Sequence, residues 1–171
     1  IFFSHFAEAF GPIYIDKNRQ QFLKNFESSD YGILSGLPPE WFEKQSSASS
    51  YAEVFGAMMD EVASAAGSNC WVEKSPHHTL LAEKIRVLFP NAVFVGVIRR
   101  DESLVASRLS GFGRQIPHGI KRWLDIIRAC AVNAMYSRYL MRLEEHDCKT
   151  LVVRYESLLQ QQEVVMRQVV D

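Results

Sequence analysis

Apolar residues recur at helical spacing in two long stretches of the chain. Residues 50–67 carry four of them, and Gly67 supplies a stop signal. Residues 120–146 carry a longer stripe and predict one long helix. The two stripes consist of Val54, Met58, Val62 and Ala65, and of Trp123, Ile127, Cys130, Ala134 and Met141. Shorter helices are predicted around Arg19–Phe26, over Pro39–Lys44, from Ser75-Pro76 to Pro90, from Asp101 onward and from about Gln161.

Short apolar runs between these helices predict strands. The run AVFVGVI at residues 92–98 is nearly continuous, as expected of a strand buried on both faces of a parallel sheet. NCWVEK at 69–74 and KTLVVRY at 149–155 predict two more strands. The alternation of strands and helices predicts an α/β fold with a mostly parallel sheet flanked by helices. Right-handed crossovers bring the carboxyl ends of such strands to one edge, where open α/β sheets bind ligands.

Composition narrows the class of protein. Of the 171 residues, 47% are hydrophobic and 23% charged, and the formal net charge is −1. This balance is typical of a globular domain and gives no reason to expect a nucleic-acid partner. We find no apolar run of the roughly 18 residues that span a bilayer, and no signal-peptide pattern. Three widely spaced cysteines predict core or half-buried thiols, so we expect a cytoplasmic protein, or a Golgi-lumenal one if an N-terminal anchor precedes the chain.

The first of two positive turns follows the predicted strand 69–74. Lys74 precedes Ser75-Pro76, a good helix start, and His77 and His78 follow. A helix N-terminus carries roughly half a positive charge and suits an anion. A lysine here can neutralise charge on a departing oxygen, and either histidine can accept a proton near neutral pH. The alternative is a solvated helix start without chemistry.

The second positive turn follows the strand 92–98. Arg99 and Arg100 end that strand, and Ser107 lies two turns into the next helix. Arginine offers a planar fork of donors and serine a hydroxyl, so Arg99 and Ser107 can bracket one phosphate. The alternative is a surface ion pair with Asp101 or Glu102. Two such turns at neighbouring strand ends favour one shared anionic ligand.

These residues resemble a known family. EKSPHH, followed by LFPNAVFVGVIRRDESLVAS and VRYESL, is similar to the sulfotransferases that use 3′-phosphoadenosine 5′-phosphosulfate (PAPS), in particular their bacterial-type and Golgi-type branches. The likeness runs from about Trp71 to the end and includes Trp123 early in a long helix. It implies a P-loop NTPase-like α/β architecture in a single domain over 1–171. Residues 1–70 are then a helical or irregular substrate-side region, and residues 71–171 an α/β part with the 3′-phosphate site.

The resemblance also implies a reaction and site residues. A sulfuryl group passes from PAPS to a hydroxyl or amine of a small-molecule or carbohydrate acceptor, and adenosine 3′,5′-bisphosphate is released. No metal is required. Arg99 and Ser107 correspond to the family's pair at the 3′-phosphate, and Lys74 to the lysine at the bridging oxygen. His78 is the first candidate for the base, His77 the second and Glu73 the third. The resemblance leaves the acceptor and the oligomeric state open.

One family feature has no counterpart in the sequence. The glycine-rich PRSGT-like loop, which binds the 5′-phosphosulfate through backbone N–H groups, is not matched, and neither is G-x-x-x-x-G-K-[ST]. The chain begins with Ile1 and stops inside the amphipathic run 160–171. We therefore expect a protein truncated at both ends, with this loop before Ile1.

Two other functions fit the sequence less well. A P-loop kinase needs an acidic Mg²⁺ ligand after a buried strand, but the strand ends here carry Lys74, Arg99 and Arg154. A non-catalytic sulfotransferase-like module would bind a partner through the aromatic N-terminal third, although these aromatic residues are expected in the core. They are Phe2, Phe3, Phe6, Phe10, Tyr14, Phe22 and Phe26.

Overall fold

A computed structural model describes residues 2–7, 9–109 and 118–170. The chain divides into two compact units. The first comprises residues 1–78 with 87–89, and the second comprises residues 79–86 with 90–171. Each unit is described by itself below.

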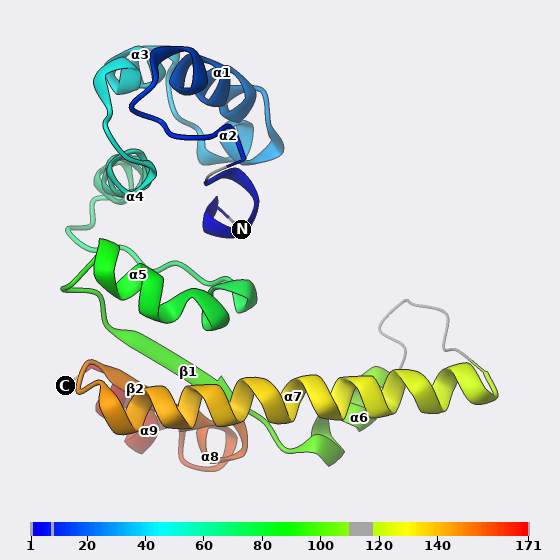
Figure 1. Cartoon of the computed structure of the whole chain (residues 1–171). Helices are drawn as coiled ribbons and strands as arrows, with labels where there is room; N and C mark the ends of the chain where they lie inside the picture. The colour runs from blue at the N-terminus through cyan, green and yellow to red at the C-terminus, as the bar shows by residue number, and fades with distance from the viewer. Residues whose placement is uncertain (1, 8, 110–117, 171) are drawn as a thin grey trace. The chain divides into compact units, whose positions relative to one another are not determined.

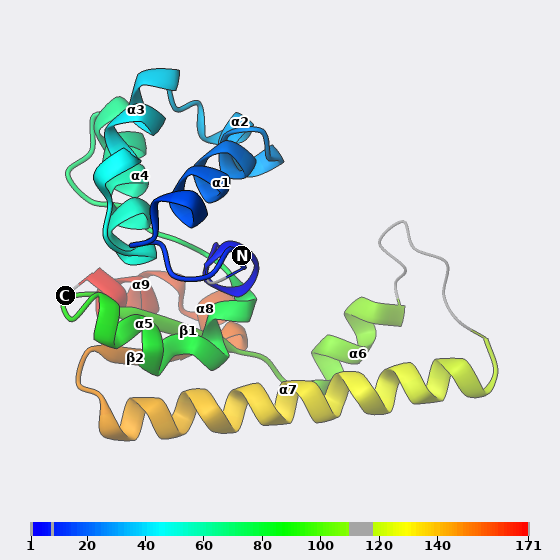
Figure 2. The same cartoon turned by 45° about the horizontal axis from the view of Figure 1, so that its top comes forward.

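The first unit is helical. Its α-helices are α1 (Asp16–Glu27), α2 (Asp30–Ser35), α3 (Pro39–Lys44) and α4 (Tyr51–Ala65), with short helical turns at Phe2–Phe6 and Gln45–Ser47. The first three α-helices lie side by side (Figures 1 and 2). Three predicted helices are confirmed here: those around 19–26 and 39–44, and the one predicted over 50–67, which spans Tyr51–Ala65. α4 starts with an N-cap, because the Ser50 hydroxyl accepts from the Glu53 N–H. The Glu53 carboxylate reaches back one residue further and accepts from the Ser49 N–H.

Aromatic side chains form the core of the first unit. Phe22 and Phe26 are fully buried and stack with ring centroids 5.7 Å apart. Phe2 packs edge-on against both, at 6.0 and 5.7 Å. Tyr14 is 71% exposed and is the clear exception among the predicted aromatic residues. The N-terminal aromatic residues are thus mainly core, as the sequence indicates, which removes most of the basis for a partner surface made of them.

The second unit holds a two-stranded parallel sheet. Strand β1 (Phe94–Ile98) pairs with β2 (Thr150–Arg154) in a register that runs from Phe94 opposite Thr150 to Ile98 opposite Arg154. Its helices are α5 (Ala82–Leu88), α6 (Asp101–Leu109), α7 (Ile120–His146), α8 (Tyr155–Gln160) and α9 (Gln162–Val170). The last two residues of α5 are assigned to the first unit. The long helix α7 lies along the sheet and beside α6 (Figures 1 and 2). A parallel sheet with helices is therefore present, and α7 has the predicted bounds.

Helix α7 approaches β1 closely because residue 96 is glycine. A Cβ atom at Gly96 would lie 2.8 Å from Leu140 Cδ2. Leu140 is itself buried, so its side chain fills the space that any larger residue in β1 would need.

Two predictions about strands are wrong for the described residues. Residues 69–74 form no strand, and Val72 within them is 89% exposed. Trp71 instead packs its ring against Phe55 at 5.7 Å, which anchors the segment by a side chain rather than by a ladder. Strand β1 is not buried on both faces either, because Val95 and Val97 remain 44% and 54% exposed on the face opposite Gly96.

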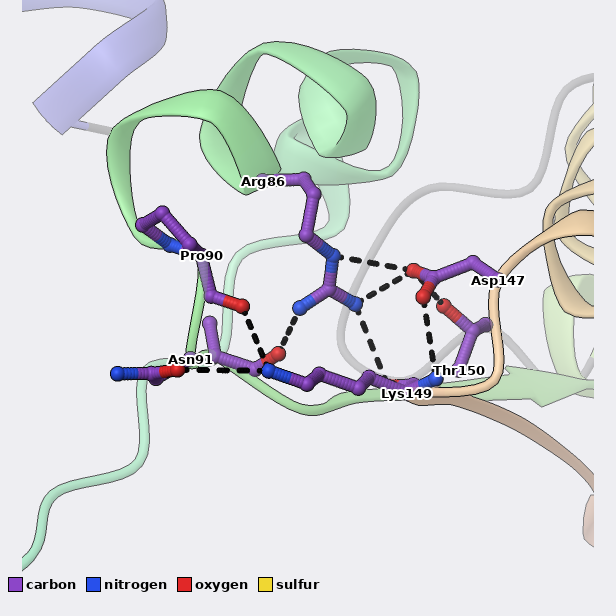
Figure 3. Close-up of polar contacts among 7 residues, drawn as sticks. Arg86, Pro90, Asn91, Asp147, Lys149 and Thr150 are labelled. Atoms are coloured by element: carbon purple, nitrogen blue, oxygen red, sulfur yellow. Dashed lines mark hydrogen bonds and ion pairs between the residues drawn. The ribbon is translucent and has the colours of Figure 1, made fainter.

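A polar cluster ties the start of β1 to the start of β2 (Figure 3). Arg86 of α5 donates to Asp147 and to the Ala92 carbonyl, and its guanidinium lies 4.5 Å from the ring centroid of Phe94. The Thr150 hydroxyl donates to Asp147 at 2.8 Å. Desolvation raises the pKa of Asp147, but the hydrogen bonds from Arg86, Lys149 N–H and Thr150 outweigh it, so the pKa lies below its ordinary value.

Two further findings concern the chain as a whole. No helix in the described ranges is both long and apolar enough to span a bilayer. The thiols are less buried than predicted, because Cys70 and Cys148 are exposed and only Cys130 is half-buried.

Candidate functional site

The first positive turn contains a carboxylate–imidazole pair. Glu73 Oε2 lies 2.7 Å from His78 Nδ1, and both side chains are largely buried. The Phe3 ring packs against the imidazole with centroids 5.7 Å apart. Because a carboxylate can only accept, Nδ1 carries the proton in this pair, and a neutral His78 then has its lone pair on Nε2. That arrangement can accept a proton.

The backbone of this turn differs from the prediction. Residues Pro76–Leu81 form a 3₁₀ segment, in which the His78 N–H donates to the Ser75 carbonyl at 2.9 Å, and α5 begins only at Ala82. The expected α-helix N-terminus directly after Lys74 is therefore wrong, and with it the dipole argument for an anion there. Lys74 and His77 are exposed, so any attraction for an anion in this turn rests on their side chains.

The second positive turn lies at the carboxyl edge of the sheet, as predicted. Since Ile98 is paired with Arg154, the next residues of the two strands, Arg99 and Tyr155, emerge together. The Arg99 guanidinium carbon lies 4.8 Å from the Tyr155 ring centroid. Arg99 Nε is buried and has no hydrogen-bond partner. A buried N–H without an acceptor is costly, and a phosphate oxygen is an acceptor that suits it.

A carboxylate from β2's continuation holds the start of α6. Glu156 Oε1 accepts from the Arg100 N–H at 3.1 Å. That bond, with help from the Ser103 hydroxyl and against desolvation, keeps the pKa of Glu156 below its ordinary value. Glu156 is thus structural, and it occupies the helix N-terminus that an anion could otherwise use.

The structure brings some predicted site residues together. Glu73 and His78 form a direct pair in the first unit. Arg99 lies at the end of β1, and Ser107 is half-buried within α6 of the same unit. Lys74 belongs to the first unit and Arg99 to the second. One anion shared by the two turns therefore remains a prediction.

Two residues that contact the second turn were not predicted from the sequence. Tyr155 stacks on Arg99, and Asn133 of α7 donates to the Arg99 carbonyl at 2.9 Å. Strand register links Tyr155 to Arg99, but the sequence does not reveal which strands pair. Asn133 lies 34 residues from Arg99 in the chain, and only the packing of α7 on the sheet brings them together.

The family model for the sulfotransferase family matches residues 14–171. The chain belongs to the sulfotransferase family. No curated protein and no solved structure gives a match. The family resemblance noted from residue 71 onward thus extends over most of the chain and includes the helices of the first unit. Sulfuryl transfer is the general activity of this family, and the sulfotransferase assignment makes the kinase alternative the weaker one.

The arginine at the carboxyl edge of the sheet offers donors that suit a phosphate group. Within residues 2–7, 9–109 and 118–170, no group of three or more His, Cys, Asp or Glu side chains is placed to bind a metal ion. Arg99 presents the unpartnered Nε described above at the carboxyl edge of the sheet, whereas the N-terminus of α6 is already occupied by Glu156. The residues present therefore fit the 3′-phosphate of the expected nucleotide.

Proposed function

We propose that this sulfotransferase transfers a sulfuryl group from PAPS to a hydroxyl group of a small-molecule or carbohydrate acceptor. The observation that carries the proposal is Arg99, whose buried Nε lacks a partner at the carboxyl edge of the parallel sheet. Family membership supports the reaction class. The donor, the acceptor and the site residues are our inference.

The 3′-phosphate of PAPS is assigned to Arg99 and Ser107. The Tyr155 ring holds the guanidinium in place, so its remaining N–H groups are oriented before a ligand arrives. Preorganised donors bind a phosphate more tightly than mobile ones, because less side-chain entropy is lost. Ser107 contributes a hydroxyl from the second turn of α6.

Acceptor activation is assigned to His78. With Nδ1–H directed to Glu73, Nε2 takes the proton of the acceptor hydroxyl as the new oxygen–sulfur bond forms. Glu73 is then the residue that positions the base and is not itself the base. His78 therefore stays the first candidate for the base, ahead of His77. Lys74 balances the charge that develops on the bridging oxygen as the sulfur–oxygen bond of the donor breaks. PAPS supplies the activated sulfuryl group, and adenosine 3′,5′-bisphosphate is the leaving group.

A hydroxyl acceptor fits this pair better than an amine. An aliphatic amine is protonated at neutral pH and must lose a proton before it attacks, whereas a hydroxyl needs a base during attack. A histidine with a carboxylate behind it supplies that base.

Calorimetric titration with adenosine 3′,5′-bisphosphate tests the donor site. Wild-type chain should bind, and Arg99→Ala and Ser107→Ala should bind at least about tenfold more weakly. Arg138→Ala is the matched control, because it removes the same charge from an exposed position of α7. Equal loss in Arg99→Ala and Arg138→Ala would mean that the effect is net charge, and the assignment of Arg99 would fail.

Turnover kinetics with PAPS and a panel of hydroxyl and amine acceptors test the base. His78→Ala should lower kcat by about 100-fold or more, whereas His77→Ala should have little effect. Glu73→Gln should lower kcat with KM for PAPS unchanged, because the amide no longer fixes the tautomer. Equal losses in the two histidine variants contradict the assignment. Nucleotide binding without turnover favours the non-catalytic module instead.

A further inference from the structure

Side chains hold the backbone between β1 and α6 from two sides. On one side, Asn133 Nδ2 donates to the Arg99 carbonyl at 2.9 Å and to Asp101 Oδ1 at 2.7 Å. On the other side, Glu156 accepts from the Arg100 N–H. Three consecutive residues are therefore each bound by a side chain: Arg99 and Asp101 by Asn133 of α7, and Arg100 by Glu156 of α8.

An asparagine suits this position for a chemical reason. Arg99 follows Ile98, the last paired residue of β1. Its carbonyl oxygen therefore needs a hydrogen-bond donor from outside the sheet. The side-chain amide carries two N–H donors on one nitrogen, and both acceptors lie within hydrogen-bond distance of it. Asn133 is half-buried on α7, a helix whose position is fixed by packing on the sheet.

The hydrogen bonds from Asn133 act on the side chain of Arg99 through the backbone. The direction in which Arg99 leaves the main chain decides whether its guanidinium can lie on the Tyr155 ring, where it is found. If the peptide of Arg99 rotates, the buried Nε moves with it. A residue that fixes this peptide therefore lowers the cost of ordering Arg99 when a phosphate binds.

We infer that Asn133 is a positioning residue for the phosphate-binding arginine, and that it contributes to recognition of the 3′-phosphate without touching the nucleotide. This inference rests on the proposed function, because it deepens the assignment of Arg99. The two residues have different roles: Arg99 binds the ligand, and Asn133 aligns Arg99.

The test compares two nucleotides that differ only in the 3′-phosphate. Adenosine 3′,5′-bisphosphate and adenosine 5′-monophosphate are titrated into wild type, Asn133→Ala and Ser137→Ala, the last being a small polar deletion one turn further along α7. Asn133→Ala should bind the bisphosphate about three- to tenfold more weakly, while its affinity for the monophosphate stays within about twofold. Ser137→Ala should keep both affinities. Asn133→Leu, which removes both donors but keeps the side-chain volume and the net charge, should reproduce the selective loss, so the test holds if Asn133→Ala fails to fold.

The outcomes separate the inference from the proposed function. A wild type that binds both nucleotides equally has no 3′-phosphate site, and the proposed function fails with the inference. A wild type that prefers the bisphosphate, with the preference kept in Asn133→Ala, overturns the inference alone. Equal weakening of both nucleotides, accompanied by a lower melting temperature, shows a merely structural role and also overturns it.

Discussion

Substitution of Gly96 by alanine is the sharpest test of how α7 packs on the sheet. The added Cβ would lie 2.8 Å from Leu140 Cδ2 and 3.2 Å from Cδ1, whereas carbon atoms pack best at about 3.5–4.0 Å. Leu140 is buried, so it must leave its rotamer or α7 must shift. Overpacking of this kind costs about 1–3 kcal/mol, and the smaller entropy of the unfolded alanine chain offsets about 0.4–1 kcal/mol. We expect a net destabilisation of about 1–2 kcal/mol.

The double variant makes the reasoning specific to this contact. Leu140→Ala alone should cost about 2–5 kcal/mol, because it leaves a cavity against β1. In Gly96→Ala/Leu140→Ala the new methyl occupies part of that cavity, so the combined loss should be at least about 1 kcal/mol smaller than the sum. Urea unfolding followed by far-UV circular dichroism measures each free energy of unfolding.

Gly56→Ala provides the matched control. Gly56 lies inside α4, and its added Cβ would meet Phe89 at 3.7 Å, an ordinary contact. The same chemical change should therefore stabilise the chain by about 0.5–1 kcal/mol there. A Gly96→Ala variant as stable as wild type, or strictly additive losses in the double variant, would refute the close approach of α7 to β1.

Three further predictions concern stability and pH. Ser50→Ala should cost about 1 kcal/mol in urea unfolding because α4 loses its N-cap, and Ser50→Thr should retain most of it. Arg86→Gln should lower the urea midpoint clearly more than Arg167→Gln, since Arg86 binds three acceptors and Arg167 forms an exposed helical pair; equal shifts would count against the cluster in Figure 3. Asp147 and Glu156 have lowered pKa values, so their contribution is present above the ordinary values of 3.8 and 4.5 and is lost as pH falls through the folded-state values. Asp147→Asn should therefore flatten the acid side of the stability–pH curve, and an unchanged acid slope would contradict the assignment.

Part of the site could be predicted because the signals are local. The turn at Arg99 was predicted from a strand end that the structure confirms, whereas the turn at Lys74 was predicted from a strand that the described residues do not form. The roles of these residues and of the base candidates stay predictions. The pairing of Glu73 with His78 was not predicted, because a turn's sequence does not say which side chains face each other. The 3₁₀ path after Ser75 decides that, and it also removes the expected helix N-terminus.

The sequence by itself determined the elements whose periodicity is long or whose ends are marked. Helix α7 has the bounds its apolar stripe predicts, and α3 begins at its proline, because 3.6-residue spacing and capping act within the segment. Tertiary structure alone decided which strands exist and which residues surround Arg99. A strand needs a partner for its backbone groups, so NCWVEK is no strand where it has none among the described residues, despite its apolar residues. Asn133 and Tyr155 reach Arg99 only because α7 and β2 pack against β1, and such packing joins residues whose separation in the chain carries no signal.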